Sequence, residues 1–152
     1  MNRCNVGHKG FTLIEIIIAI TITAVSSAIA SVSYQGHIES RNISNAISQI
    51  SHVASALDNY IHVNKRYPDS LAEIGLNDIL DPWENPYQYS IAEDPCAEIS
   101  RKDHTISTLN TDYDLYSMGK DGTSVSRLSA KTSRDDVIRA NNGNYIGLAT
   151  EY

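Results

Sequence analysis

The distribution of apolar residues divides the chain into two parts. From Ile16 to Tyr34 there is no charged residue, and isoleucine, alanine and valine dominate. Beyond Gly36, polar and apolar residues are mixed throughout. The uncharged segment is long enough to cross a hydrocarbon core of about 30 Å, which needs roughly 20 residues. The pattern therefore predicts one apolar helix joined to one polar domain.

Helical periodicity continues beyond the apolar segment. Apolar residues recur there at the spacing of one helix face: Ile43, Ala46, Ile47, Ile50, Val53, Ala54, Leu57, Tyr60 and Ile61. Lys65 and Arg66 suit the negative end of a helix dipole, and Pro68 disfavours helix at the residue before it. We predict a helix from Phe11 to Arg66, apolar all round over residues 11–34 and amphipathic over residues 35–66.

The region 67–152 has the pattern of a small mixed domain. Leu71–Ile74 reads as a short helix that Gly75 stops. Tyr87–Ile91 and Tyr113–Met118 alternate as half-buried strands do, and Thr105–Leu109 is a further candidate. We predict an α+β fold in which a long N-terminal helix packs through residues 35–66 on a small antiparallel sheet.

The N-terminal residues carry an unusual acid. Arg3 and Lys9 are the only charges before Glu15, and the positive-inside rule places them in the cytoplasm and the C-terminal domain across the membrane. A carboxylate at membrane depth costs about 2.5–3.5 kcal/mol. If the chain is cut between Gly10 and Phe11, the new amine of Phe11 lies one helical turn from Glu15, in the same chain or a neighbour. Alternatively, Glu15 is an interfacial acid among the lipid headgroups.

The order Lys9-Gly10-Phe11-Thr12-Leu13-Ile14-Glu15 resembles the cleavage and methylation signature of type IV prepilins and type II secretion pseudopilins. The resemblance implies that a prepilin peptidase removes residues 1–10 by cutting after Gly10, and that Phe11 is N-methylated. It also implies that Glu15 docks each incoming subunit against the N-terminus of a neighbour.

Two further stretches narrow the resemblance. Asp81-Pro82-Trp83-Glu84-Asn85-Pro86-Tyr87-Gln88-Tyr89 is similar to the DPWGNPYQY stretch of major pseudopilins, and Asp114-Leu115-Tyr116-Ser117-Met118-Gly119-Lys120-Asp121-Gly122 to their DIYSLGADG stretch. The implied fold is pilin-like. The implied role is a single-pass inner-membrane subunit with a periplasmic domain, which polymerises into a helical pseudopilus that drives protein export. The implied partners are further copies, minor pseudopilins, the prepilin peptidase and an inner-membrane assembly platform.

Two alternative functions remain open at the level of sequence. A type IV pilus subunit, used for adhesion, motility or DNA uptake, would share the N-terminal signature. A membrane-anchored binding protein that never polymerises would share the apolar helix.

A calcium site is also implied by the resemblance to major pseudopilins. It places Asp121 and the adjacent Asp135 and Asp136 at ligating positions, assisted by backbone oxygens such as that of Met118. Calcium takes six to eight oxygen ligands. Neighbouring acids repel one another unless a cation is present or their side chains point in separate directions. Alternatively, Lys131 or Arg134 pairs with these acids. We expect Asp112 and Asp114 on the solvent face of a strand.

Composition excludes several other functions. The net charge of −6 argues against a nucleic-acid binder that depends on a broad basic surface. There is no Gly-x-Ser-x-Gly elbow, no pair of histidines four residues apart and no glycine-rich phosphate loop, so we expect no enzyme activity. Of the two cysteines, Cys4 would leave with residues 1–10, so Cys96 would have no partner for an intrachain disulfide.

Overall fold

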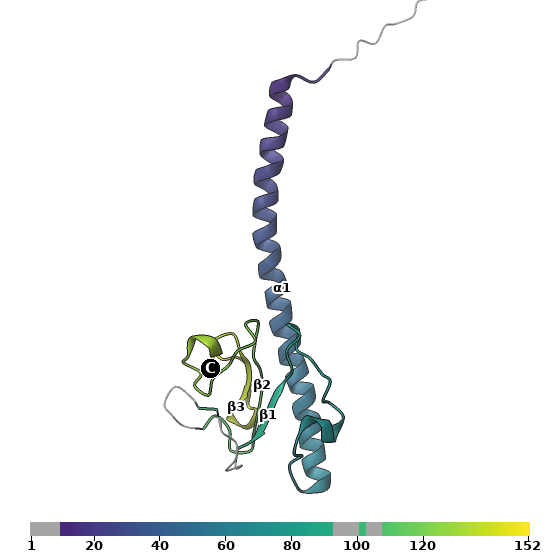
Figure 1. Cartoon of the computed structure of the whole chain (residues 1–152), viewed down its shortest axis with the longest axis vertical. Coiled ribbons are helices and arrows are strands. Elements are labelled where there is room, and N and C mark those ends of the chain that lie inside the picture. Colours follow the sequence, from purple (N-terminus) through teal and green to yellow (C-terminus); the bar gives the residue numbers. More distant parts are fainter. Residues whose placement is uncertain (1–9, 93–100, 103–107) are drawn as a thin grey trace, which may run out of the picture. The chain divides into compact units, whose positions relative to one another are not determined.

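The computed structural model describes residues 10–92, 101–102 and 108–152, without the side chains of residues 28–33. Helix α1 spans Leu13–Asn64, two residues shorter at each end than predicted (Figure 1). The chain divides into two compact units, Met1–Glu39 and Ser40–Tyr152, and both contain part of α1.

The first unit is helical from Leu13 onward, and its large apolar side chains face outward. Leu13 is 79% exposed and Val25 is 62% exposed. Among the described residues, no helix has an apolar stretch long enough to cross a membrane. The transmembrane segment predicted over residues 11–34 includes residues 28–33, whose side chains lie outside the described part of the chain.

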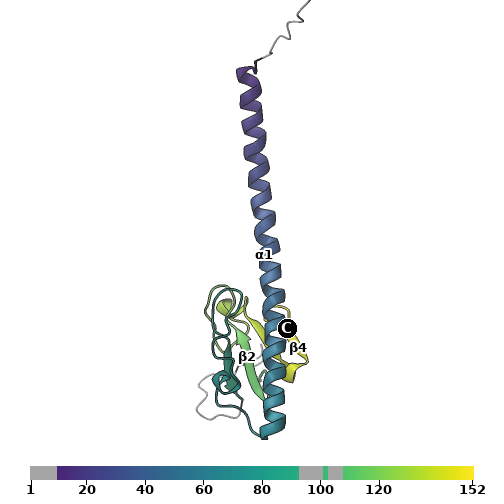
Figure 2. The same ribbon diagram turned by 90° about the vertical axis from the view of Figure 1, so that its right-hand side faces the viewer.

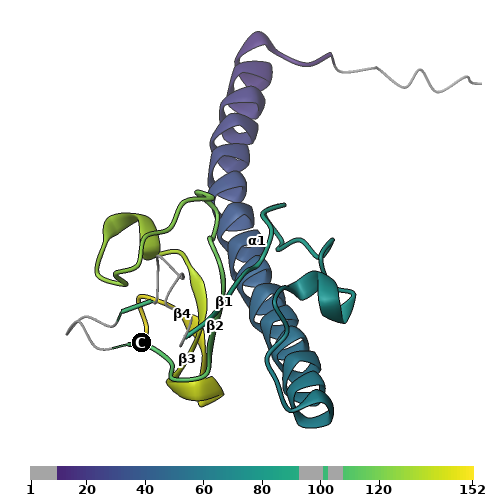
Figure 3. The ribbon, with the colours of Figure 1, turned by 60° about the horizontal axis from the view of Figure 1, so that its bottom comes forward.

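The second unit contains a four-stranded antiparallel sheet in the order β1-β2-β3-β4 (Figures 1 and 3). The strands are β1 (Gln88–Ile91), β2 (Tyr113–Ser117), β3 (Val137–Ala140) and β4 (Tyr145–Leu148). The predicted α+β class with a pilin-like arrangement is therefore confirmed, and two of the strands lie where they were predicted. The candidate strand at Thr105–Leu109 falls mostly on residues 103–107, which lie outside the described residues.

The main core lies between the sheet and the part of α1 that follows Glu39 (Figure 2). The helix contributes buried residues from the predicted apolar face: Ala46, Ile50, Val53, Ala54 and Leu57. Tyr113 and Leu115 of β2 and Val137 of β3 pack against them. Burying a side chain of this size contributes about 1.5–3 kcal/mol, so this contact is the main support of the second unit.

A second apolar cluster covers the opposite face of the sheet. Ile138 and Ala140 of β3 pack with Leu128, which belongs to the connection between β2 and β3. All four residues of β3 are consequently buried. A strand buried on both faces lacks the alternation of polar and apolar residues that identifies a half-buried strand.

The described part of the second unit also contains three one-turn helices, η1 (Leu71–Ile74), η2 (Lys131–Ser133) and η3 (Asn141–Gly143). The predicted turn between η1 and β1 is organised by Asp81, which is 4% exposed. Its carboxylate accepts hydrogen bonds from the backbone N–H groups of Trp83 and Asn85 and from the hydroxyl of Ser117. The turn requires a positive φ of 71° at Glu84.

Candidate functional site

The predicted cleavage junction lies immediately before α1. Gly10 and Phe11 are both exposed, and the ring of Phe11 is 80% exposed. A methyl group added at Gly10 would meet no atom within 4 Å. Packing among the described residues therefore does not require glycine at this position.

Glu15 lies in a reciprocal cap at the start of α1. Its backbone N–H donates to the Thr12 hydroxyl at 3.3 Å, and the Thr12 N–H donates to Oε2 of Glu15, also at 3.3 Å. This is the Thr-x-x-Glu capping box, a local role that the sequence interpretation of Glu15 did not consider. Both bonds are exposed and long, so the carboxylate is free to exchange this contact for a stronger one with a cation.

The outward-facing apolar side chains near Glu15 form a continuous set on α1. We call this set the apolar helix surface; it comprises Leu13, Ile14, Ile16, Ile17, Ile18, Ile20, Ile22 and Val25, each between 44% and 79% exposed. Side chains of one helix cannot bury one another on all sides. Exposed apolar surface of this extent marks contact with a membrane or another protein.

The predicted calcium ligands lie at the two ends of the connection between β2 and β3, residues 118–136, which we call the β2–β3 loop. The backbone N–H of Asp121 donates to Oδ2 of Asp135 at 3.0 Å. A methyl group at Gly119, whose φ is 65°, would lie 2.3 Å from the carbonyl oxygen of Asp135. Only glycine fits here, and this close approach brings Asp121 and Asp135 together.

Asp136 has a different environment from the two other predicted ligands. It is fully buried, it forms an ion pair with Arg101, and it accepts a hydrogen bond from the Ser124 hydroxyl at 2.6 Å. Burial raises the pKa of Asp136 against the opposing charge of Arg101. Within residues 10–92, 101–102 and 108–152, no three His, Cys, Asp or Glu residues are grouped so that they could hold a metal ion. Asp136 is therefore held by an ion pair, but its partner is Arg101 and not Lys131 or Arg134, the partners predicted as the alternative to calcium.

The expectation of a place on the solvent face of a strand is wrong for Asp114, whereas Asp112 lies just before β2 and is 24% exposed. Asp114 is 1% exposed, and its carboxylate accepts hydrogen bonds from Nδ2 of Asn110 and from the backbone N–H of Arg101, both at 2.8 Å. Asp112 is paired with Arg139 at 2.6 Å. Burial raises the pKa of Asp114. Burial also acts to raise the pKa of Asp112, but hydrogen bonds from Arg139 and the Tyr113 N–H outweigh this effect, so the pKa of Asp112 is lowered. The second apolar cluster covers this face of the sheet, which explains the error.

Comparison with known proteins identifies the family. Residues 6–31 match the model of the prokaryotic N-terminal methylation motif, and residues 33–132 match that of type II secretion system protein G. The chain belongs to the type II secretion system protein G family. The predicted resemblance to major pseudopilins, and with it the role of structural subunit in type II secretion, is confirmed.

Curated relatives in this family carry the name type II secretion system core protein G. The one from Pectobacterium carotovorum subsp. carotovorum is 31% identical, over 76% of this chain and 70% of its own length. The one from Pseudomonas aeruginosa is 26% identical, over 76% of this chain and 85% of its own. The one from Aeromonas hydrophila is 29% identical, over 53% of this chain and 71% of its own. No solved structure matches the chain.

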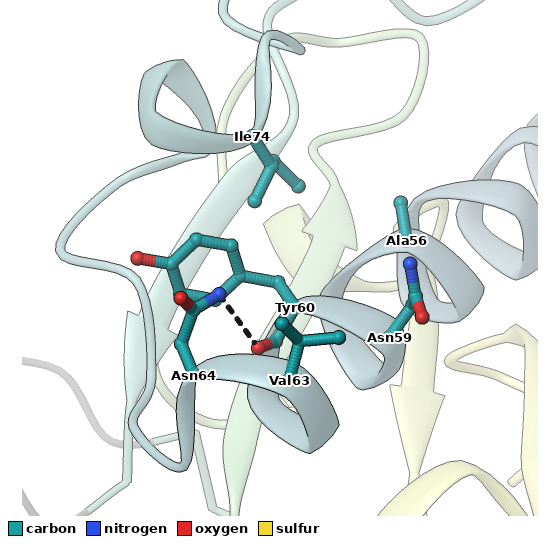
Figure 4. A pocket seen from close by; sticks show the side chains of 6 residues that line it. All are labelled: Ala56, Asn59, Tyr60, Val63, Asn64 and Ile74. Atoms are coloured by element: carbon teal, nitrogen blue, oxygen red, sulfur yellow. Dashed lines mark hydrogen bonds between the residues drawn. The ribbon is translucent and has the colours of Figure 1, made fainter.

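A shallow hollow at the C-terminal end of α1 contains none of the predicted site residues. It has a volume of about 320 Å³ and is lined by Ala56, Asn59, Tyr60, Val63, Asn64 and Ile74 (Figure 4). Nδ2 of Asn64 donates to the backbone oxygen of Tyr60 at 3.0 Å, so the amide is already engaged within the helix.

Sequence reasoning overlooked Arg101. It is 1% exposed, and its guanidinium lies 3.8 Å from the centre of the Tyr116 ring. The sequence offered one weak signal, because the adjacent acids Asp135 and Asp136 repel unless a cation is present or their side chains diverge. Nothing in the chain order pointed to an arginine 35 residues before Asp136.

Proposed function

We propose that this pseudopilin is made as a precursor that a prepilin peptidase cuts between Gly10 and Phe11, and that N-methylation of Phe11 follows. The exposed junction and the methylation motif over residues 6–31 support this proposal. The mature subunit is then held in the inner membrane by the apolar segment, with residues 67–152 in the periplasm. It is a structural subunit and not an enzyme.

The observation that carries the proposed assembly is the apolar helix surface around Glu15. Ile14, directly before this acid, and Ile16, directly after it, are 62% and 47% exposed. Copies that bundle through these side chains remove them from water or lipid and form the core of a helical filament. The Glu15 carboxylate leaves its exposed cap and pairs with the amine of Phe11 in the neighbouring copy, which neutralises both charges inside the bundle.

Growth of this filament from the inner membrane would drive export of proteins by the secretion system. The partners we propose are further copies of the chain, minor pseudopilins and the inner-membrane assembly platform. The family match to type II secretion supports this role over the alternatives of a pilus subunit and a membrane-anchored binding protein.

We also propose that Ca²⁺ binds to the β2–β3 loop in a reduced form of the predicted site. Asp121 and Asp135 would hold it, because their backbone and side chain already meet there. The bound ion would neutralise the two acids and cross-link both ends of the loop. Asp136 contributes less than predicted, since Arg101 and Ser124 hold its carboxylate.

The test of assembly is substitution of Glu15 in cells that carry the rest of the secretion system. In Glu15→Ala, we expect mature chains that begin at Phe11 by intact mass spectrometry, no chemically cross-linked ladder of subunits and no secretion. Glu39→Gln is the matched control, because it changes another acid of α1 outside the apolar segment and should preserve the ladder. A normal ladder from Glu15→Ala would refute the docking role.

The test of calcium is the melting temperature of the full-length protein in detergent. We expect a higher melting temperature in millimolar calcium chloride than in chelator, and loss of this difference in Asp121→Asn. Asp78→Asn, on an exposed turn outside the loop, is the control. If wild-type protein melts at the same temperature in both buffers, the calcium proposal is wrong.

A further inference from the structure

Arg101 is bound on several sides within the second unit. Its guanidinium forms the ion pair with Asp136 and stacks on Tyr116 of β2. Its backbone N–H donates to Asp114 of β2 at 2.8 Å, and its carbonyl oxygen accepts from the N–H of Leu109 at 2.9 Å. One residue therefore connects the central strand of the sheet with the end of the β2–β3 loop.

The residue after Arg101 fastens the same loop by backbone hydrogen bonds. The N–H of Lys102 donates to the carbonyl oxygen of Ser126 at 2.8 Å, and its own carbonyl oxygen accepts from the N–H of Leu128 at 3.3 Å. Lys102 and Arg127 form a parallel β-bridge. The segment 101–102 consequently lies against residues 126–128, in the middle of the loop whose end holds Asp136.

A fully buried guanidinium is costly, since the charge loses its hydration. Among the described residues, Nε and Nη1 of Arg101 and Oδ1 of Asp136 have no hydrogen-bond partner. Complete hydrogen bonding therefore does not explain why this ion pair is present. Apolar side chains of similar volume would suit this place at least as well for stability alone. The pair is better explained by a need for positive charge beside Asp114 and Asp136, two buried acids that both contact Arg101.

We propose that Arg101 is a built-in cation that holds the β2–β3 loop closed without a metal ion. The guanidinium neutralises Asp136, one of the three acids that the family resemblance assigned to calcium, and removes it from the metal site. Calcium bound at Asp121 and Asp135 would then further stabilise a loop that is already closed without it. This inference does not need calcium to bind, so it can stand or fail separately from the calcium proposal.

Hydrogen–deuterium exchange of the full-length protein in detergent, followed by mass spectrometry of peptides from residues 118–136, tests this role. In chelator, the wild-type loop should exchange slowly. Arg101→Met keeps much of the side-chain volume but removes the charge, so the loop should exchange roughly a hundredfold faster in chelator. Added calcium should slow that exchange again, because Asp136 is released to join Asp121 and Asp135.

Arg139→Met is the matched control. Arg139 is also buried and paired with an aspartate, Asp112, and its guanidinium lies 3.9 Å from the centre of the Tyr113 ring. It does not contact Asp136 in any described interaction. Its loss should destabilise the sheet without selectively exposing residues 118–136. Should Arg101→Met fail to fold, Asp136→Asn is a milder variant that removes the same ion pair, and it should loosen the same peptides in chelator.

Two results would overturn the proposal. One is a wild-type loop that exchanges rapidly in chelator and is protected only by calcium, since the metal would then be the cation that closes it. The other is slow exchange in chelator after loss of the Arg101 charge. A wild-type loop that is protected in chelator and unaffected by calcium would support the role of Arg101 while contradicting the calcium proposal.

Discussion

The two halves of α1 differ in where their apolar side chains find partners. After Glu39, the apolar face is buried against the sheet, and Ile50, Val53 and Leu57 have no exposed surface. Before Glu39, similar side chains, such as Leu13 and Val25, are more than 60% exposed. Among the described residues, the second unit therefore buries its apolar helix face within one chain, whereas the first leaves its apolar side chains exposed.

This difference separates the roles of the two units. Changes in the buried half should act on folding, and changes in the exposed half should act on assembly. Trp83 is the only tryptophan in the chain and lies in the second unit, so its fluorescence reports unfolding of that unit alone.

The largest expected effect is a difference in the free energy of unfolding between alanine substitutions at two leucines of α1. Leu57→Ala should lower the free energy of unfolding of the second unit by about 2–5 kcal/mol, because it leaves a cavity in the core. Leu13→Ala, at a position 79% exposed, should leave that free energy unchanged and weaken only the cross-linked ladder. Denaturant titration followed by Trp83 fluorescence measures the first effect. Equal losses of stability in both variants would contradict the division of roles.

The next effect concerns Asp81, which accepts three hydrogen bonds in the turn before β1. Asp81→Ala leaves the buried Ser117 hydroxyl and two backbone N–H groups without their acceptor. We expect a loss of about 1–3 kcal/mol in the same denaturant titration. Asp78→Ala, on the preceding exposed turn, should change stability little. A neutral result for Asp81→Ala would show that the turn is not organised by this carboxylate.

A gain in stability is expected at Glu84, whose φ of 71° suits glycine and strains other residues. Glu84→Gly should raise the free energy of unfolding by about 1 kcal/mol, because the strain is released. Glu84→Ala keeps the β-carbon and is the control, which should show no such gain. If both variants change stability equally, the glutamate charge rather than backbone strain is responsible.

The smallest effect is a dependence on pH at the junction of α1 and η1. Hydrogen bonds from Arg66, Tyr60 and the backbone of Asp69 lower the pKa of Glu73 to about 2. Because the pKa is lower in the folded state, this contribution is present above the ordinary value of 4.5 and is lost as the pH falls toward 2. Melting curves of wild type and Glu73→Gln should differ at pH 6 and converge near pH 2. A constant difference across this range would exclude the linkage.

Periodicity in the sequence was sufficient to predict α1, η1, β1 and β2. It missed β3, because Val137–Ala140 is buried on both faces and shows no alternation, and it missed the short strand β4 beyond the turn at Asn141–Gly143. The same layer over the sheet made the expectation of an exposed Asp114 wrong. The pattern of apolar residues predicts which face of a helix or strand is buried in the main core. It does not predict burial of the other face by a loop that is distant in the sequence.

For the candidate sites too, local features could be predicted from the sequence and long-range contacts could not. The N-terminal site is local, so the order of residues from Gly10 to Glu15 was enough to predict it. The ion pair of Arg101 and Asp136 joins residues 35 positions apart, and only the fold brings them together.

Disulfide cross-linking through the exposed half of α1 tests the central claim most directly. Ile18→Cys, in a Cys96→Ser background, places a thiol at a half-exposed position of the apolar helix surface. In cells with the complete secretion system, we predict oxidised pairs of copies that form with Glu15 present and disappear in Glu15→Ala. Absence of pairs with Glu15 intact, or equal pairing without it, would contradict the account.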